Sequence, residues 1–319
     1  VIMTILTRPS RRNPAYTGTA RSRAKSRRRV FASPPVPRPR YHALGRDAHM
    51  LNYRAHVVLL CLVLGVCWGA PTASLAQAVP GLDEQRALAE RGDADAQFAL
   101  GAMYSSGRGG VVQDVPTAAH WFRLAADQGH EQAQLTLGVH YLTGDGVPQN
   151  PTEAVRLFRL AGEQGNVFAQ NNLGVVYQGI PEPFRTDKDV PVDHAESVRW
   201  FRRAADQGHA VSAMNLAVKY RRGDGVAQDY TQAFGWFRRA AALGDVNARR
   251  EVGGMYAAGQ GVPQNDIEAY MWLDLAVLQA FGEDREILLI DREAVAERMT
   301  AQQIAEAQRR VNAWTPSSR

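Results

Sequence analysis

Cysteine is scarce in this sequence, and both cysteines lie in one short stretch. Cys61 and Cys67 belong to an apolar segment near the N-terminus, so the rest of the chain has no disulfide, thiolate nucleophile or cysteine metal site. The sequence also lacks the H-E-x-x-H and G-x-S-x-G motifs of zinc and serine hydrolases. We therefore expect a protein that is not an enzyme and that holds no cofactor and no metal.

Outside the first 49 residues, acidic side chains outnumber Lys and Arg. Residues 1–49 carry 12 Lys and Arg against one acid, Asp47, whereas the whole chain has a net charge of +5. The remainder is therefore mildly acidic, which argues against nucleic acid as a partner. Residues 1–49 lack hydrophobic periodicity, and we expect them to be a disordered basic leader. They are either a transit peptide or basic arm, or the product of a start assigned too early, with Met50 as the true first residue.

Long apolar runs are also rare, and the one present has the layout of an export signal. Residues 50–78 contain a basic n-region at Arg54, an apolar core at 57–67 and an A-x-A site ending at Ala78. The apolar core is shorter than the roughly 20 helical residues that span a bilayer. We expect cleavage before Val79, a periplasmic or secreted product and no stable membrane span afterwards. An uncleaved anchor is the alternative.

The main feature of the chain is an internal repeat. Two independent markers recur with the same steps of 37, 36, 43 and 36 residues, and a fixed period of this length predicts a solenoid. The markers are Leu100, Leu137, Leu173, Leu216 and Val252, and Tyr104, Tyr141, Tyr177, Tyr220 and Tyr256.

Each unit has the pattern of a helix, a glycine loop and a second helix. A glycine such as Gly138 in the first helix permits close approach of its neighbour, and an Asp or Asn begins the second helix as an N-cap. The aromatic stripe of the second helix has the spacing of a core rather than of a ring-stacking platform. On the opposite face of the second helix we expect i,i+4 ion pairs exposed to solvent. These pairs are Arg123 with Asp127, Arg159 with Glu163, and Arg202 with Asp206. The N-caps are Asp114, Asn150, Asp193, Asp229 and Asn265.

The third unit contains seven extra residues within 178–193. Three prolines there are incompatible with a helix, and a long loop on one repeat is often a contact surface. Phe184 is the candidate anchor of this insertion loop. Asp187, Asp189 and Asp193 resemble a cation-binding loop only loosely, because the closing Gly and Glu are missing.

The two ends should cover the apolar faces of the terminal repeats. We expect an N-terminal capping helix at residues 79–95, the repeats at residues 96–282 and C-terminal capping helices at residues 283–319. Thr300 and Gln303 form a capping box that begins the last helix. That helix should turn Ile304, Ala307, Val311 and Trp314 inward, and Arg309 and Arg310 outward.

The consensus pattern of the units is A-x-x-x-L-G-x-x-Y-x-x-G-x-G-V, then [DN]-x-x-x-A and a closing A-A-x-x-G. This pattern resembles the Sel1-like repeat, a relative of the tetratricopeptide repeat. Ala133–Gly165 and Ser212–Gly244 match it closely. The resemblance implies an all-α, right-handed α/α superhelical solenoid of about five helix-loop-helix repeats that scaffolds protein complexes. A cysteine-rich exported branch of the family is linked to β-lactam binding or hydrolysis. Its paired cysteines are missing here, so that activity is not carried over.

The side of the first helix opposite the Leu, Gly and Tyr positions predicts a groove with an apolar floor, provided that first helices line the concave face. Amide side chains there could hold the backbone of an extended peptide, or they bond only within the solenoid. We expect an exported non-catalytic adaptor with a protein or peptide partner. The alternatives are a regulatory subunit of an envelope enzyme or secretion system, or a cell-envelope hydrolase. The groove residues are Phe98, Leu135, Asn171, Asn172, Met214, Asn215, Val139, Val175 and Val218.

Overall fold

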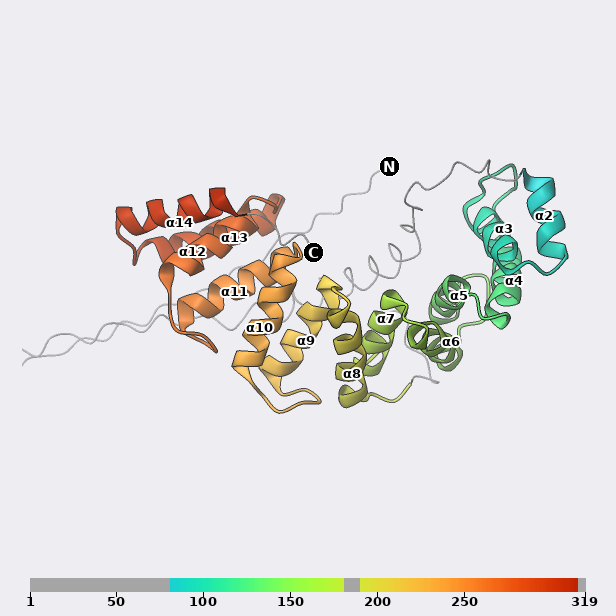
Figure 1. Cartoon of the computed structure of the whole chain (residues 1–319), viewed down its shortest axis with the longest axis horizontal. Helices are drawn as coiled ribbons and strands as arrows, with labels where there is room; N and C mark the ends of the chain where they lie inside the picture. The colour runs from blue at the N-terminus through green and yellow to red at the C-terminus, as the bar shows by residue number, and fades with distance from the viewer. Residues whose placement is uncertain (1–80, 181–189, 315–319) are drawn as a thin grey trace, which may run out of the picture. The chain divides into compact units, whose positions relative to one another are not determined.

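The structure, a computed structural model, describes residues 81–180 and 190–314. Within these ranges the chain forms thirteen helices and no strand (Figure 1). The basic leader, the export signal and its cleavage point lie outside the described residues. No helix in the described part has the length and apolar character needed to cross a membrane.

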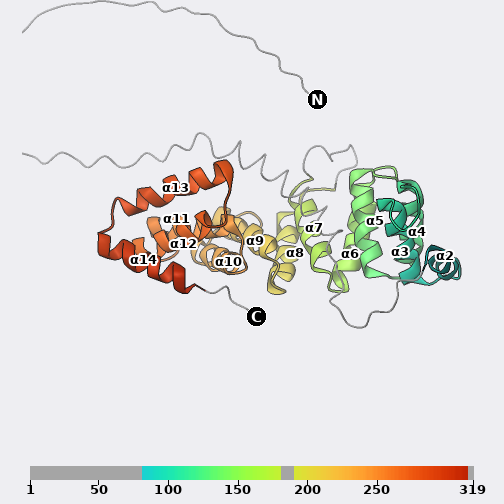
Figure 2. The ribbon, with the colours of Figure 1, turned by 90° about the horizontal axis from the view of Figure 1, so that it is seen from above.

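The first twelve helices pack in sequence order, each against the next (Figures 1 and 2). Five hairpins follow one another, and in each a first helix packs on a second helix, which confirms the all-α solenoid. The first helices are α3 (Ala94–Ser106), α5 (Glu131–Thr143), α7 (Val167–Gln178), α9 (Ala210–Arg222) and α11 (Val246–Ala258). The second helices are α4 (Val115–Asp127), α6 (Pro151–Glu163), α8 (His194–Asp206), α10 (Tyr230–Ala242) and α12 (Asp266–Val277).

Polar caps begin both helices of every hairpin. The predicted Asp or Asn caps each second helix; Asp193, for example, accepts a hydrogen bond from the backbone N–H of Glu196 at 2.9 Å. Such a cap satisfies a backbone donor that the helix itself leaves unpaired. The first helices are capped in the same way, which the sequence reading missed. Their caps are Asp93, His130, Asn166, His209 and Asp245.

In the first three hairpins a glycine of the first helix lies in close contact with an aromatic ring of the second helix. Phe158 is fully buried, and a Cβ added to Gly138 would lie 2.6 Å from its ring. The same relation joins Gly101 to Phe122 at 2.7 Å. Glycine is therefore required because the ring occupies the space of a side chain, and the aromatic stripe is confirmed as core at Phe122, Phe158, Phe201 and Phe237.

The loops connect one hairpin to the preceding one. Gly146 has a φ of 70°, and a Cβ on it would lie 2.7 Å from the carbonyl oxygen of Val115, where α4 begins. Gly225 and Gly261 make the same close approach to the starts of α8 and α10. These glycines serve both the left-handed backbone and the contact between neighbouring repeats.

The predicted i,i+4 ion pairs are replaced by hydrogen bonds between helices. Arg123 donates to the hydroxyl of Tyr141 at 2.7 Å, and Arg159 donates to the hydroxyl of Tyr177 at the same distance. Arg202 makes the equivalent bond to Tyr220. The pairing prediction was wrong because exposed ion pairs contribute little, whereas the hydroxyl at the joint offers a partly buried acceptor.

A second ladder of polar contacts crosses the buried side of the first three hairpins. Gln134 donates to the carbonyl oxygen of Ala126 at 3.2 Å and accepts from Gln164 at 2.8 Å. Gln97 and Gln170 make the equivalent bonds with their neighbours. Each Gln therefore adds a hydrogen bond to a carbonyl at the end of the preceding helix, which also accepts one from the backbone of the following turn.

Extra helices cover both ends of the repeat array. Helix α2 (Leu82–Glu90) packs on α3, while α13 (Gly282–Ala296) and α14 (Ala301–Ala313) both pack on α12. The capping box at Thr300 is confirmed, and Ala307 and Val311 are buried as predicted. Arg310 is exposed as predicted, and it also pairs with Glu268 of α12 at 2.5 Å.

Candidate functional site

Four of the predicted groove residues are partly exposed. Phe98, Val139, Met214 and Asn215 come from α3, α5 and α9, and each keeps part of its side chain open to solvent. Phe98 stacks on the imidazole of His130, with ring centroids 4.7 Å apart. Three apolar side chains and one amide thus remain accessible along these first helices.

The other five predicted groove residues on the described helices are buried. Leu135, Val175 and Val218 belong to the core, and Asn171 and Asn172 are only 3% and 4% exposed. The Oδ1 of Asn171 accepts a hydrogen bond from the hydroxyl of Ser212 at 2.9 Å, across the joint between α7 and α9. The side-chain amide of Asn171 therefore bonds within the solenoid, which was the alternative expectation for the amides of the predicted groove.

Ser212 also contacts a histidine, which raises the question of chemistry. Its Oγ lies 2.8 Å from Nδ1 of His209, while the Asn171 carboxamide accepts from the same hydroxyl. Ser212 is 0% exposed, so its hydroxyl has no access to a substrate. Burial also lowers the pKa of His209 to about 4. The arrangement therefore has the character of a structural cap on α9 rather than of a nucleophile and base.

Charged residues flank the partly exposed residues at the C-terminal end of the array. Arg221 pairs with Glu251 at 2.6 Å, which links α9 to α11. Arg250 pairs with Asp291 of α13, also at 2.6 Å. The charges on this part of the first-helix face are therefore largely neutralised in pairs, which favours a partner held by apolar and amide contacts.

The insertion-loop anchor cannot be placed on the structure. Phe184, Asp187 and Asp189 lie outside the described residues, whereas Asp193 caps α8. Within 81–180 and 190–314 no group of three or more His, Cys, Asp or Glu side chains is arranged to hold a metal ion.

The sequence reading missed a second regularity that proved informative. An arginine precedes each marker tyrosine by 18 residues, and four of the five pairs are hydrogen-bonded across a helix joint. The constant spacing was available in the sequence, but the expectation of i,i+4 ion pairs concealed it. In the described part of the chain, the fifth pair, Arg238 with Tyr256, makes no such bond, which sets the last joint apart.

Comparison with known proteins shows which solved structures these repeats resemble. A solved Sel1 repeat protein from Oxalobacter formigenes is 24% identical, with a TM-score of 0.55, and the match covers 72% of this chain and 98% of that one. A protective antigen present in uropathogenic Escherichia coli strains, which displays the same repeat fold, is 25% identical with a TM-score of 0.48. That match covers 83% of this chain and 62% of the antigen.

No curated protein sequence matches the chain. The Sel1 repeat family matches five consecutive stretches, at residues 94–130, 131–166, 167–209, 210–245 and 246–281. Each stretch contains one of the five hairpins described above, and together they span more than half of the sequence. The chain therefore belongs to the Sel1 repeat family, whose repeats generally mediate protein–protein interaction.

Proposed function

We propose that the protein is an exported, non-catalytic adaptor that binds a protein or an extended peptide along its first helices. The observation that carries the proposal is the run of partly exposed Phe98, Val139, Met214 and Asn215 on helices whose other sides are packed. Stacked repeats present such positions as one continuous surface, because each hairpin contacts its neighbours directly. Export is supported by the signal pattern of residues 50–78.

The chemistry of these positions suits a peptide backbone. A carboxamide such as that of Asn215 can donate and accept at once, which matches the alternating N–H and C=O groups of an extended chain. Apolar neighbours such as Met214 would shield those hydrogen bonds from water, with buried Val175 and Val218 as the floor. The partner is then held by main-chain contacts, with apolar side chains selecting the sequence.

The test is partner capture from an envelope extract by the full chain. Asn215→Ala should reduce the captured partner several-fold and leave the melting temperature nearly unchanged, because the Asn215 side chain is partly exposed. Gln232→Ala, an exposed amide on α10, is the matched control and should capture as the wild type does. If both variants capture the same amount of partner, the proposed groove is contradicted.

The regulatory alternative shares this surface and differs only in its partner. If the captured protein is an envelope enzyme whose rate changes on binding, the chain is a regulatory subunit. If the captured proteins include no enzyme, the adaptor role stands.

A further inference from the structure

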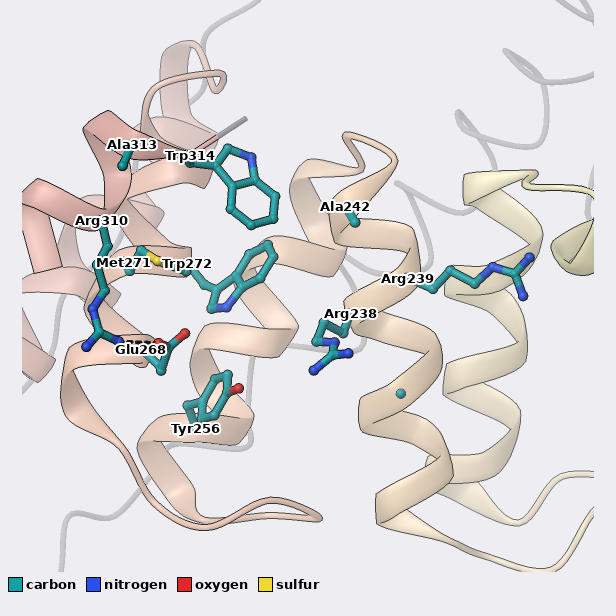
Figure 3. A pocket seen from close by; sticks show the side chains of 11 residues that line it. Arg238, Arg239, Ala242, Tyr256, Glu268, Met271, Trp272, Arg310, Ala313 and Trp314 are labelled. Carbon is teal, nitrogen blue, oxygen red and sulfur yellow. Dashed lines mark hydrogen bonds and ion pairs between the residues drawn. The ribbon is translucent and has the colours of Figure 1, made fainter. Parts of the chain in front are cut away.

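An open pocket of about 920 Å³ lies where α10, α11, α12 and α14 meet (Figure 3). Its apolar wall includes Trp272 and Trp314, whose rings meet edge to face with centroids 4.8 Å apart. Tyr256 and Met271 continue that wall, and α10 forms the opposite side. This site belongs mainly to the second helices and the last helix, and it is separate from the first-helix residues discussed above.

One repeat position that lines the pocket carries no side chain. Counting with the repeat, the residue before the Trp or Leu of the second helix is His120, Arg156, Arg199 or Met271 in four units. The fourth unit has Gly235 there, which is exposed, lines the pocket and would have no atom within 4 Å of an added Cβ. A longer side chain at this position would fill the space that Gly235 leaves open.

The same pocket contains the one arginine that breaks the arginine–tyrosine pattern. Among the described residues, Arg238 makes no hydrogen bond and no ion pair, although its equivalents at 86, 123, 159 and 202 all bond a tyrosine. Tyr256 instead packs edge-on against Phe234, with centroids 5.1 Å apart. Phe234 stands where the other hairpins mostly have Ala or Val. Figure 3 shows Arg238 reaching toward Tyr256 and Trp272.

The other charges of the pocket are already neutralised. Glu268 pairs with Arg310 at 2.5 Å, and Arg239 extends away from the tryptophans to pair with Asp206 at 3.3 Å. One exposed guanidinium therefore remains beside an aromatic wall. A guanidinium binds a carboxylate through two parallel hydrogen bonds, and the tryptophan wall suits an apolar group next to that carboxylate.

We propose that this pocket binds an acidic peptide segment in which Asp or Glu lies beside a large apolar residue. The carboxylate pairs with Arg238, and the apolar side chain lies against the partly exposed rings of Tyr256 and Trp314. The volume is within the usual range for a ligand site and accommodates only a few residues, so the recognised segment is short. The site gives the protein a second, chemically distinct contact with a partner, independent of the first-helix surface.

The test uses isothermal titration calorimetry on the full-length chain. The probes are blocked tetrapeptides Gly-Leu-Glu-Gly, Gly-Phe-Glu-Gly and Gly-Trp-Glu-Gly, each with its Gln counterpart as a neutral control. At least one Glu peptide should bind, and its Gln counterpart should bind about tenfold or more weakly, because a hydrogen bond to a charged group is lost. Arg238→Gln should abolish that difference without lowering the melting temperature.

Gly235→Met should weaken every peptide of the panel by filling the pocket, whereas Gly235→Ala should not. Arg202→Gln removes a paired arginine outside the pocket and should keep the preference for Glu. The Asn215→Ala variant should also keep it, which separates this site from the proposed groove. The proposal is overturned if no Glu peptide binds at millimolar concentration, if Glu and Gln peptides bind equally, or if Arg238→Gln retains the preference.

Discussion

The guanidinium of Arg159 donates a hydrogen bond to the hydroxyl of Tyr177 at 2.7 Å and thereby ties α6 to α7. The two residues lie 18 positions apart, and the same spacing recurs at the other joints between hairpins. The bond joins the second helix of one repeat to the first helix of the next. It therefore contributes to stacking between repeats rather than to the fold of any single hairpin.

Tyr177→Phe should lower the free energy of unfolding by about 0.5–1.5 kcal/mol, because it removes the acceptor of this bond and leaves the ring in place. Tyr256→Phe is the matched control, because the Tyr256 hydroxyl makes no such bond and its removal should change stability little. Urea unfolding followed by circular dichroism measures both. Equal losses in the two variants would mean that the arginine bond contributes nothing.

Gly138→Ala should destabilise the protein by about 1–3 kcal/mol, because the new methyl group would overlap the Phe158 ring in a packed core. Gly235→Ala has open space around the new methyl group and should raise stability by up to about 1 kcal/mol through helix propensity. Melting temperatures give the comparison. A rise in both variants would show that the glycine–phenylalanine contact can relax freely.

Stability should fall as the pH is lowered from about 6.5 to 4. Burial lowers the pKa of His209 to about 4, so the folded protein keeps this imidazole neutral while the unfolded chain protonates it from about 6.5 downward. The unfolded state then binds more protons, and the free energy of unfolding decreases by about 1–3 kcal/mol across that interval. The contribution is fully present above pH 6.5.

His209→Asn supplies the control for this pH dependence. Asn166 occupies the equivalent cap of α7 and accepts from the backbone N–H of Ala169 at 2.8 Å, so Asn at 209 can keep the cap without titrating. Chemical denaturation at several pH values should show a smaller loss toward acid in this variant. An unchanged slope would assign the acid sensitivity to other groups.

The repeated parts of the fold could be predicted from the sequence, because one physical requirement recurs five times. Gly138 is needed for the approach of Phe158, Asn150 for a cap and Gly146 for a turn, and each of these positions recurs in most of the units. The sequence left open whether Asn171 lines a groove or bonds within the solenoid, because its bond to Ser212 depends on how two repeats are placed against each other. The partners of Arg123 were misassigned for the same reason, since spacing along one helix says nothing about the next helix.

The candidate pocket was not predictable as a pocket, although its residues could be read in advance. Gly235 and Phe234 depart from the repeat pattern in the sequence itself. Their consequence depends on α14, whose Trp314 closes the wall beside Trp272. The docking of a terminal helix has no repeat to specify it, so only the structure brings these residues together.

Expression from Met50 in a bacterial host with a periplasm should give an exported protein whose first residue is Val79. The A-x-A site ending at Ala78 is the basis of this expectation. Intact mass and N-terminal peptides of the exported protein measure it. Recovery of residues 1–49 or of an intact signal on that protein would contradict the export proposal.

Photo-crosslinking in the native cell tests the central claim most directly, because Lys25, Lys188 and Lys219 are the only lysines and leave lysine-reactive reagents few sites. A photoreactive residue placed at Asn215 reports on the first-helix surface, and one at Gln232 reports on the exposed side of α10. The account predicts that a discrete protein partner is captured from position 215 and not from position 232. Capture from 232 alone, or from neither position, would contradict it.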